Sequence, residues 1–177
     1  SNNIVKVKPS NKENKSSYIY QLERQIISIL LKYGAEEIVF EDMVLNKNEK
    51  GDVVESIKEI RSKVYEKIYL DLQQDEIEFT HGPFKEIYNK LVNSFNSQDL
   101  VSTDSFINDL EPNSSKIVSD ILINDEKYQL HDWEKKNIYV KKIGSELSQL
   151  VNQTILNMRR HLIDKKIDEL QDNSENK

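Results

Sequence analysis

Residues 144–171, GSELSQLVNQTILNMRRHLIDKKIDELQ, are the most informative stretch of the chain. At about 100° per residue, their apolar side chains form two separate stripes on a helix. The first stripe contains Leu147, Leu150, Val151, Ile155, Met158 and Leu162, and the second contains Leu156, Ile163, Ile167 and Leu170. The second stripe lies nearly opposite the first, so a straight helix cannot bury both against one surface. Either another element of this chain covers the second stripe or the stripe binds another chain.

Upstream of this helix, residues 17–125 contain further helical patterns. Apolar residues at steps of three and four predict a helix over 18–33, because this spacing places them on one face. Ser17 is suited to the N-cap of that helix and Gly34 to its end.

Asp52 and Glu55 have the spacing of a capping box, which predicts a second helix from Asp52 to about residue 73. Its apolar stripe consists of Val53, Ile57, Ile60, Val64 and Ile68. Three further helices are predicted, one starting at Gly82-Pro83 and two over 103–109 and 113–123.

These patterns predict an all-α fold. A helical bundle over 17–125 is followed by a C-terminal helical subdomain over 126–177, either one long helix or a helical hairpin. Residues 1–16 are polar and rich in Lys, which is typical of a disordered tail or linker. One short β pair, between 38–40 and 138–140, is the alternative for these two apolar triplets.

Composition excludes several classes of protein. The chain has no Cys, which rules out disulfides, zinc–thiolate sites and thiol nucleophiles. Its net charge of −6 is atypical of a nucleic-acid-binding domain, which normally carries a basic face. The longest nearly unbroken apolar stretch, 26–31, is far too short to span a bilayer, so no membrane contact is expected. The chain begins Ser-Asn-Asn with no signal peptide, which suggests a cytoplasmic fragment of a longer protein.

Two groups of residues are weak candidates for chemistry. A carboxylate cluster that Mg²⁺ could occupy consists of Asp71, Asp75, Glu76 and Glu78, and an acid–base dyad is formed by His131 and Asp132. Neither group has a nucleophile or a phosphate-binding loop beside it. The sequence therefore predicts a fragment that is not an enzyme, with no catalytic residues, no metal site and no cofactor.

Two stretches carry a family resemblance. The first is Leu72-x-x-Asp75-x-Ile77-x-Phe79 followed by Pro83-Phe84. The second is Tyr128-x-Leu130-x-x-Trp133-Glu134-Lys135, followed by Ile138-Tyr139-Val140 and the long helix from Leu147 to Leu170. Over roughly residues 18–171, their combination and order resemble the C-terminal region of bacterial DnaG-type primases, especially forms from the Bacteroidetes.

This resemblance implies a helicase-interaction domain. In that family, a helical bundle and a C-terminal helical hairpin dock the primase onto the N-terminal domains of the hexameric DnaB-type replicative helicase for primer synthesis. We combine this implication with the second stripe, because partner helices recognise each other through anchors at such spacings. The predicted helicase contact consists of Leu156, Arg159, Arg160, Ile163, Ile167 and Leu170.

Three alternatives remain at this stage. The basic C-terminal helix of a nucleic-acid-binding module would give a DNA affinity that falls steeply with salt, although little or no DNA binding is expected here. A metal enzyme built on the carboxylate cluster would be stabilised by Mg²⁺. A second copy of the chain could also cover the second stripe, giving a homodimer through the C-terminal helix.

Overall fold

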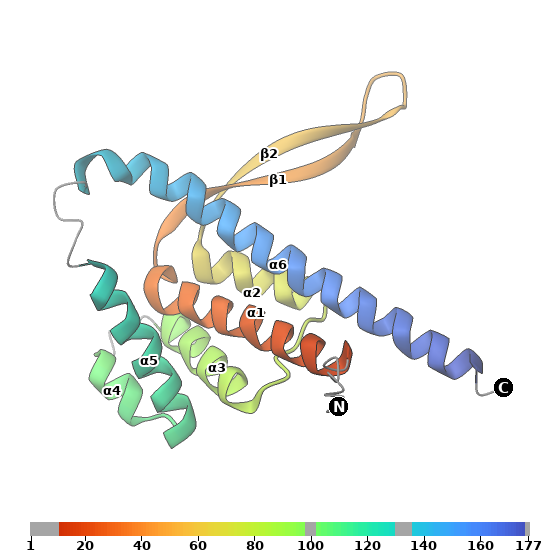
Figure 1. Ribbon diagram of the computed structural model, residues 1–177. Coiled ribbons are helices and arrows are strands. Elements are labelled where there is room, and N and C mark those ends of the chain that lie inside the picture. Colours follow the sequence, from red (N-terminus) through yellow and green to blue (C-terminus); the bar gives the residue numbers. More distant parts are fainter. Residues whose placement is uncertain (1–10, 98–101, 130–135, 176–177) are drawn as a thin grey trace, which may run out of the picture.

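The computed structural model describes residues 11–97, 102–129 and 136–175, with side chains placed over 17–97, 102–123 and 144–172. The elements are α1 (Asn11–Tyr33), β1 (Glu37–Lys47), β2 (Val53–Lys63), α2 (Val64–Gln74), α3 (Gly82–Ser97), α4 (Thr103–Asn108), α5 (Pro112–Gln129) and α6 (Lys136–Glu175). The helices form the body of the molecule, and the two strands extend away from it (Figure 1).

The prediction of an all-α fold is wrong. β1 and β2 pair along their whole length as an antiparallel hairpin, from Glu37 opposite Lys63 to Lys47 opposite Val53. The root of this hairpin contacts the helices, and its far end projects from them (Figure 1). The molecule is therefore a helical bundle with a long β arm.

The turn of the hairpin explains why the helix predicted from Asp52 is also wrong. The Asn48 side-chain oxygen accepts hydrogen bonds from the backbone N–H groups of Lys50 and Asp52, each at 2.9 Å. Gly51 has a φ of 84°, which glycine adopts without steric cost. Asp52 thus closes a β turn instead of capping a helix.

Only the second half of that predicted helix is helical, as α2. Its start is supported by Glu66, whose carboxylate accepts from the Lys63 backbone N–H at 3.3 Å and from the Ser62 hydroxyl at 3.2 Å. The capping pattern therefore occurs eleven residues later than the sequence suggested.

The predicted β pair between 38–40 and 138–140 is wrong in its partner. Ile38, Val39 and Phe40 do form a strand, but they lie opposite residues 60–62 of β2. Residues 138–140 belong to α6 instead. The sequence of 38–40 thus predicted a strand correctly, but it did not identify 60–62 as the segment with which that strand pairs.

The remaining helix predictions are confirmed by α1, α3, α4 and α5. α1 begins at Asn11, inside the segment predicted as a tail. α6 is one continuous helix rather than a hairpin, and it starts eight residues before the predicted Gly144. Leu130 and the 131–135 segment, which includes the His131–Asp132 dyad and Trp133, lie outside the described residues.

The core lies where α1 contacts α2, α3 and α6. α6 crosses the face of α1 and α2 and then continues past them (Figure 1). The largest fully buried side chains include Phe40, Phe84, Ile26, Ile27, Leu30, Ile68 and Met158. The hairpin root contributes Phe40 to this core, so a buried side chain as well as the chain connection holds the β arm to the bundle.

Two carboxylates, one fully buried and one partly buried, tie the helices together. Glu23 of α1 is fully buried and accepts hydrogen bonds from the Thr80 N–H and hydroxyl, at 2.6 and 2.7 Å, and from the His81 ring Nδ1 at 2.6 Å. Glu86 of α3 accepts from the Ser114 hydroxyl at 2.5 Å and from the Glu111 N–H at 3.0 Å, at the start of α5. The Ser114 hydrogen bond is the main reason that the pKa of Glu86 is lowered.

Candidate protein-interaction site

The two stripes of α6 have different environments. In the first stripe, Leu147, Val151, Ile155 and Met158 are buried in the core, whereas Leu150 is partly exposed. This half of α6 is thus part of the bundle. The first stripe ends at Leu162, which is half-buried, and the contact between α6 and the core ends near this residue. Beyond it, the apolar residues of α6 lie on the opposite side of the helix.

The second stripe is exposed. Leu156, Ile163, Ile167 and Leu170 have between 46% and 70% of their surface accessible. The end of α6 extends past the bundle (Figure 1). Of the two explanations offered by the sequence, coverage by another element of the same chain is not found among the described residues.

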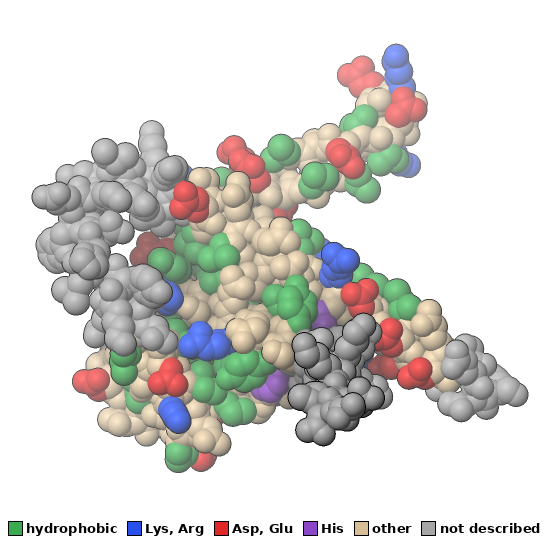
Figure 2. Space-filling model, in the orientation of Figure 1, with side chains coloured by type: hydrophobic (Ala, Val, Ile, Leu, Met, Phe, Trp, Pro, Cys, Tyr) green, Lys and Arg blue, Asp and Glu red, His purple; other side chains and the backbone are tan. Residues whose placement is uncertain are grey.

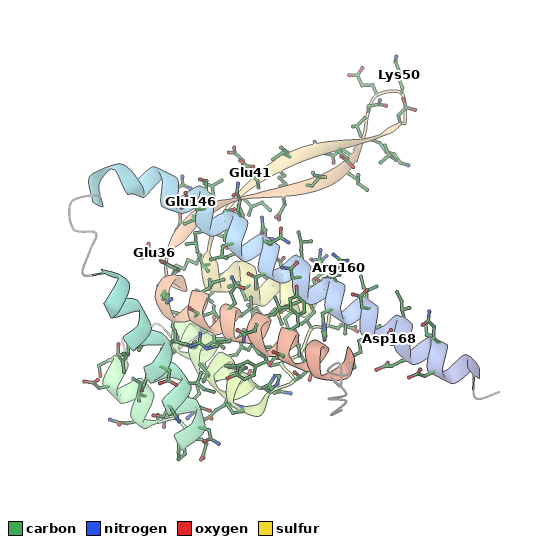
Figure 3. All side chains as sticks on the ribbon, viewed as in Figure 1. Glu36, Glu41, Lys50, Glu146, Arg160 and Asp168 are labelled. Carbon is green, nitrogen blue, oxygen red and sulfur yellow. The ribbon has the colours of Figure 1, made fainter. Side chains whose placement is uncertain are left out.

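The two arginines beside this stripe have different roles. Arg159 forms an ion pair with Asp75 of its own chain, with its Nε at 2.7 Å and its Nη2 at 2.5 Å from the same carboxylate oxygen. Arg160 forms no ion pair with any described residue and points away from the body (Figure 3). Arg159 therefore joins α6 to the end of α2, and Arg160 is the cation that the stripe presents.

The carboxylate cluster predicted around Asp71 does not come together. Lys67 neutralises Asp71 at 2.8 Å, and Lys85 lies 3.2 Å from Glu78. Asp75 is held by Arg159. Within the described ranges, no three His, Asp or Glu side chains are grouped so that they could hold a metal ion. The alternative of a carboxylate metal enzyme thus has no support in the geometry.

A groove lies between the hairpin root and the first half of α6. It encloses about 1350 Å³ and is lined on the hairpin by Glu37, Ile38, Val39, Glu41, Glu59 and Arg61. On α6 it is lined by Gly144, Ser145, Glu146, Ser148, Gln149, Leu150, Asn152, Gln153 and Leu156. The Asn152 amide donates to the Glu41 carbonyl oxygen at 3.4 Å and joins the two walls. Figure 3 shows Glu41 and Glu146 where the hairpin passes α6. The second stripe begins at the end of this groove, since Leu156 belongs to both.

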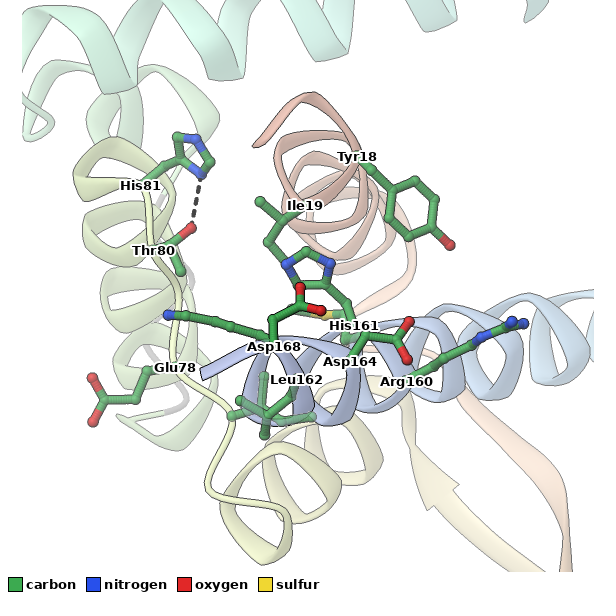
Figure 4. Close-up of a pocket in the computed structure, with 13 residues that line it drawn as sticks. Tyr18, Ile19, Glu78, Thr80, His81, Arg160, His161, Leu162, Asp164 and Asp168 are labelled. Carbon is green, nitrogen blue, oxygen red and sulfur yellow. Dashed lines mark hydrogen bonds between the residues drawn. The ribbon is translucent and has the colours of Figure 1, made fainter. Parts of the chain in front are cut away.

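A second cavity, of about 780 Å³, lies where α6 leaves the bundle (Figure 4). α1, the 77–81 segment and α6 line it. His81 is held by Glu23 and by the Thr80 hydroxyl at 3.1 Å, and the His161 ring lies 6.2 Å from that of Tyr18. Both imidazoles thus take part in contacts between elements.

The hairpin adds an apolar surface that the sequence did not reveal. Met43, Leu45, Val53 and Ile57 lie on one face of the hairpin, and each is between 63% and 71% exposed. Figure 2 shows apolar side chains along the arm, interrupted by acidic ones. Had the hairpin been recognised, its strand register would have placed these four residues together.

The helices show no membrane-spanning character. In the described ranges, none has an apolar stretch of the length needed to cross a bilayer.

Comparisons with known proteins give one result. Residues 9–177, nearly the whole chain, match the model of a family described as "Domain of unknown function (DUF8430)". Searches of curated proteins and of solved structures found no significant match. The resemblance to DnaG-type primases is not tested by these comparisons and stays a prediction. The chain belongs to the DUF8430 family.

Proposed function

We propose that this chain is a non-catalytic protein-interaction domain that docks its parent protein onto a partner through the second stripe of α6. The exposure of that stripe on a projecting helix end carries the proposal. Four large apolar side chains at helical spacing, beside an arginine that has no ion pair with a described residue, have the chemistry of a helix that binds a groove on another protein.

From the resemblance to DnaG-type primases, we propose the N-terminal domain of a DnaB-type replicative helicase as the partner, in the cytoplasm. The parent protein would then be a DNA primase, and docking would bring primer synthesis to the helicase. The contact residues are those predicted from sequence, except that Arg159 is committed to Asp75. Leu156, Arg160, Ile163, Ile167 and Leu170 remain.

The test is a calorimetric titration of the chain with the N-terminal domain of the replicative helicase from the same organism. The double variant Ile163→Asp, Ile167→Asp should weaken binding by at least about tenfold, because it places two carboxylates in the apolar contact. Its melting temperature should stay close to that of the unmodified chain, because both side chains are exposed.

Lys165→Asp is the matched control. It changes the charge by the same two units in the same turns of α6, but on the side of the helix away from the stripe. It should bind like the unmodified chain. Absence of binding by the unmodified chain would contradict the helicase assignment, and equal binding by all three proteins would contradict the role of the stripe.

The alternative of a nucleic-acid-binding module gains no support from the geometry. On α6, Arg159 is paired with Asp75, and Lys165 and Lys166 are flanked by Asp164 and Asp168. A basic face of the kind that tracks a phosphate backbone is not present on the described part of this helix. A gel shift at low salt would show such an activity if the chain had it.

A further inference from the structure

The groove at the hairpin and the second stripe lie on one face of α6. At about 100° per residue, Gln149, Asn152 and Leu156, which line the groove, fall within the same 60° sector as Ile163, Ile167 and Leu170. The face is walled by the hairpin over the first half of α6 and open over the second half. A helix lying along this face would meet both.

The charges of the two halves are complementary. Glu41 and Glu59 lie directly opposite each other in the hairpin, an arrangement of like charges that destabilises a strand pair. Neither carboxylate has an ion pair with any described residue. On the open half, Arg160 is likewise without an ion pair in the described part of the chain. The groove also contains Arg61, but this side chain lies 3.7 Å from Glu37, so the described lining keeps an excess of negative charge. Arg160 places a positive charge beside the stripe.

We propose that a second copy of the chain occupies this face, with the two α6 helices antiparallel and a two-fold axis near Leu156. From Leu156, the groove half extends back to Gly144, roughly 18 Å, and the stripe extends forward to Leu170, roughly 21 Å. Because the two halves have nearly the same length, each stripe fills the groove of the other copy. The interface is closed and self-complementary.

The register of this arrangement places the charges together. Arg160 is four residues after Leu156, and Asn152 is four residues before it. Under the two-fold axis, Arg160 of one copy lies level with Asn152 of the other, whose amide contacts the backbone of Glu41. Arg160 of each copy thus reaches the level of the Glu41–Glu59 pair, while Ile163 and Ile167 enter the groove beside Val39 and Leu150.

This proposal does not depend on the identity of the helicase partner. Because both use the second stripe, self-association and docking to another protein exclude each other. The dimer is then a resting form whose stripe becomes available on dissociation.

The test is analytical ultracentrifugation of the whole chain over a range of concentrations. We expect a reversible monomer–dimer equilibrium that weakens as salt is added. Glu41→Gln with Glu59→Gln, and separately Arg160→Glu, should each raise the dissociation constant by about tenfold or more, as for the loss of a close interfacial charge pair. The matched control, Glu49→Gln with Glu55→Gln, removes two carboxylates from the outer part of the hairpin and should leave the equilibrium unchanged.

Charge exchange gives the sharpest result. Glu41→Arg alone should prevent dimerisation, and combining it with Arg160→Glu in one chain should restore it. A chain that stays monomeric at millimolar concentration would overturn the proposal, as would a dimer insensitive to all of these substitutions. Absence of helicase binding by the Glu41→Gln, Glu59→Gln variant, which keeps the second stripe but should be monomeric, would contradict the proposed function alone.

Discussion

At the scale of single residues, the polar groups of the core differ in how well they are satisfied. Glu23 is fully buried but accepts hydrogen bonds from both Thr80 and His81. The Tyr88 hydroxyl is buried without a hydrogen-bond partner among the described residues. Its ring packs against that of Phe79, with 4.8 Å between the centroids. Burial, followed by the nearby Tyr69, raises the pKa of Tyr88 to about 12.

We predict that Tyr88→Phe stabilises the protein. It keeps the ring contact and removes an unsatisfied buried hydroxyl, so the free energy of unfolding should rise by about 1 kcal/mol in a urea titration. Tyr65→Phe is the control, because the Tyr65 hydroxyl donates to Glu66 at 3.3 Å. The control should not be stabilised, and an equal loss of stability in both variants would contradict the prediction.

At the scale of elements, the hairpin depends on its root. A two-stranded hairpin alone is at best marginally stable in water. Here Phe40 is buried in the core, and Lys67 of α2 lies 3.1 Å from Asp42 and 5.9 Å from the centre of the Phe40 ring. The outer rows, such as Met43 opposite Ile57, have no comparable support from the bundle.

This difference predicts unequal effects of truncating side chains. Phe40→Ala should lower the free energy of unfolding by about 3–5 kcal/mol, because it leaves a cavity in the core. Ile57→Ala should change it by no more than about 0.5 kcal/mol, because the side chain is 68% exposed. Thermal unfolding followed by circular dichroism distinguishes the two, and similar losses would show that the outer hairpin is packed in solution.

At the scale of the whole molecule, α6 serves two purposes. Its first half completes the core against α1, α2 and the hairpin root, and its second half extends away from the bundle (Figure 1). The division falls near Leu162, where the first stripe ends. Folding and partner binding can therefore be separated by shortening the chain at that point.

We predict that a chain ending at Leu162 unfolds cooperatively, at a melting temperature close to that of the full chain. A chain ending at residue 143 should not fold, because it loses the four buried side chains of Leu147, Val151, Ile155 and Met158. At roughly 1.5–3 kcal/mol for each, their loss rivals the whole stability of a typical domain, about 5–15 kcal/mol. The dispersion of amide resonances in an NMR spectrum would show which chains fold. Failure of the longer chain to fold would place the tip of α6 in the core.

The helices of the bundle could be predicted because each buries one stripe, and burial imposes the three- and four-residue spacing that the sequence displays. The hairpin could not. Its arm buries neither face, so no alternation of apolar and polar residues marks the strands. The spacing of Val53, Ile57, Ile60, Val64 and Ile68 also matches a helix by coincidence.

The second stripe of the candidate site could also be predicted, because helical spacing of apolar residues is visible in the sequence. The change of stripe within α6 is a property of residue order, and the four apolar residues of the second stripe follow from it. The commitment of Arg159 to Asp75 was not predictable, because these residues are 84 positions apart and meet only when α6 packs on α2. The groove at Glu41 and Glu59 was missed because it requires the strand register.

The sequence by itself determined the helical core, the helical character of the C-terminal stretch and the two directions of its apolar stripes, because these depend on the local periodicity of a regular helix. Whether that stretch is one helix or a hairpin was decided by the structure, in which α6 is continuous. Only the tertiary structure decided that the second stripe is left exposed, that a β arm stands beside it and that one of the two arginines is already paired. These depend on contacts between segments far apart in the chain, and local periodicity carries no information about them.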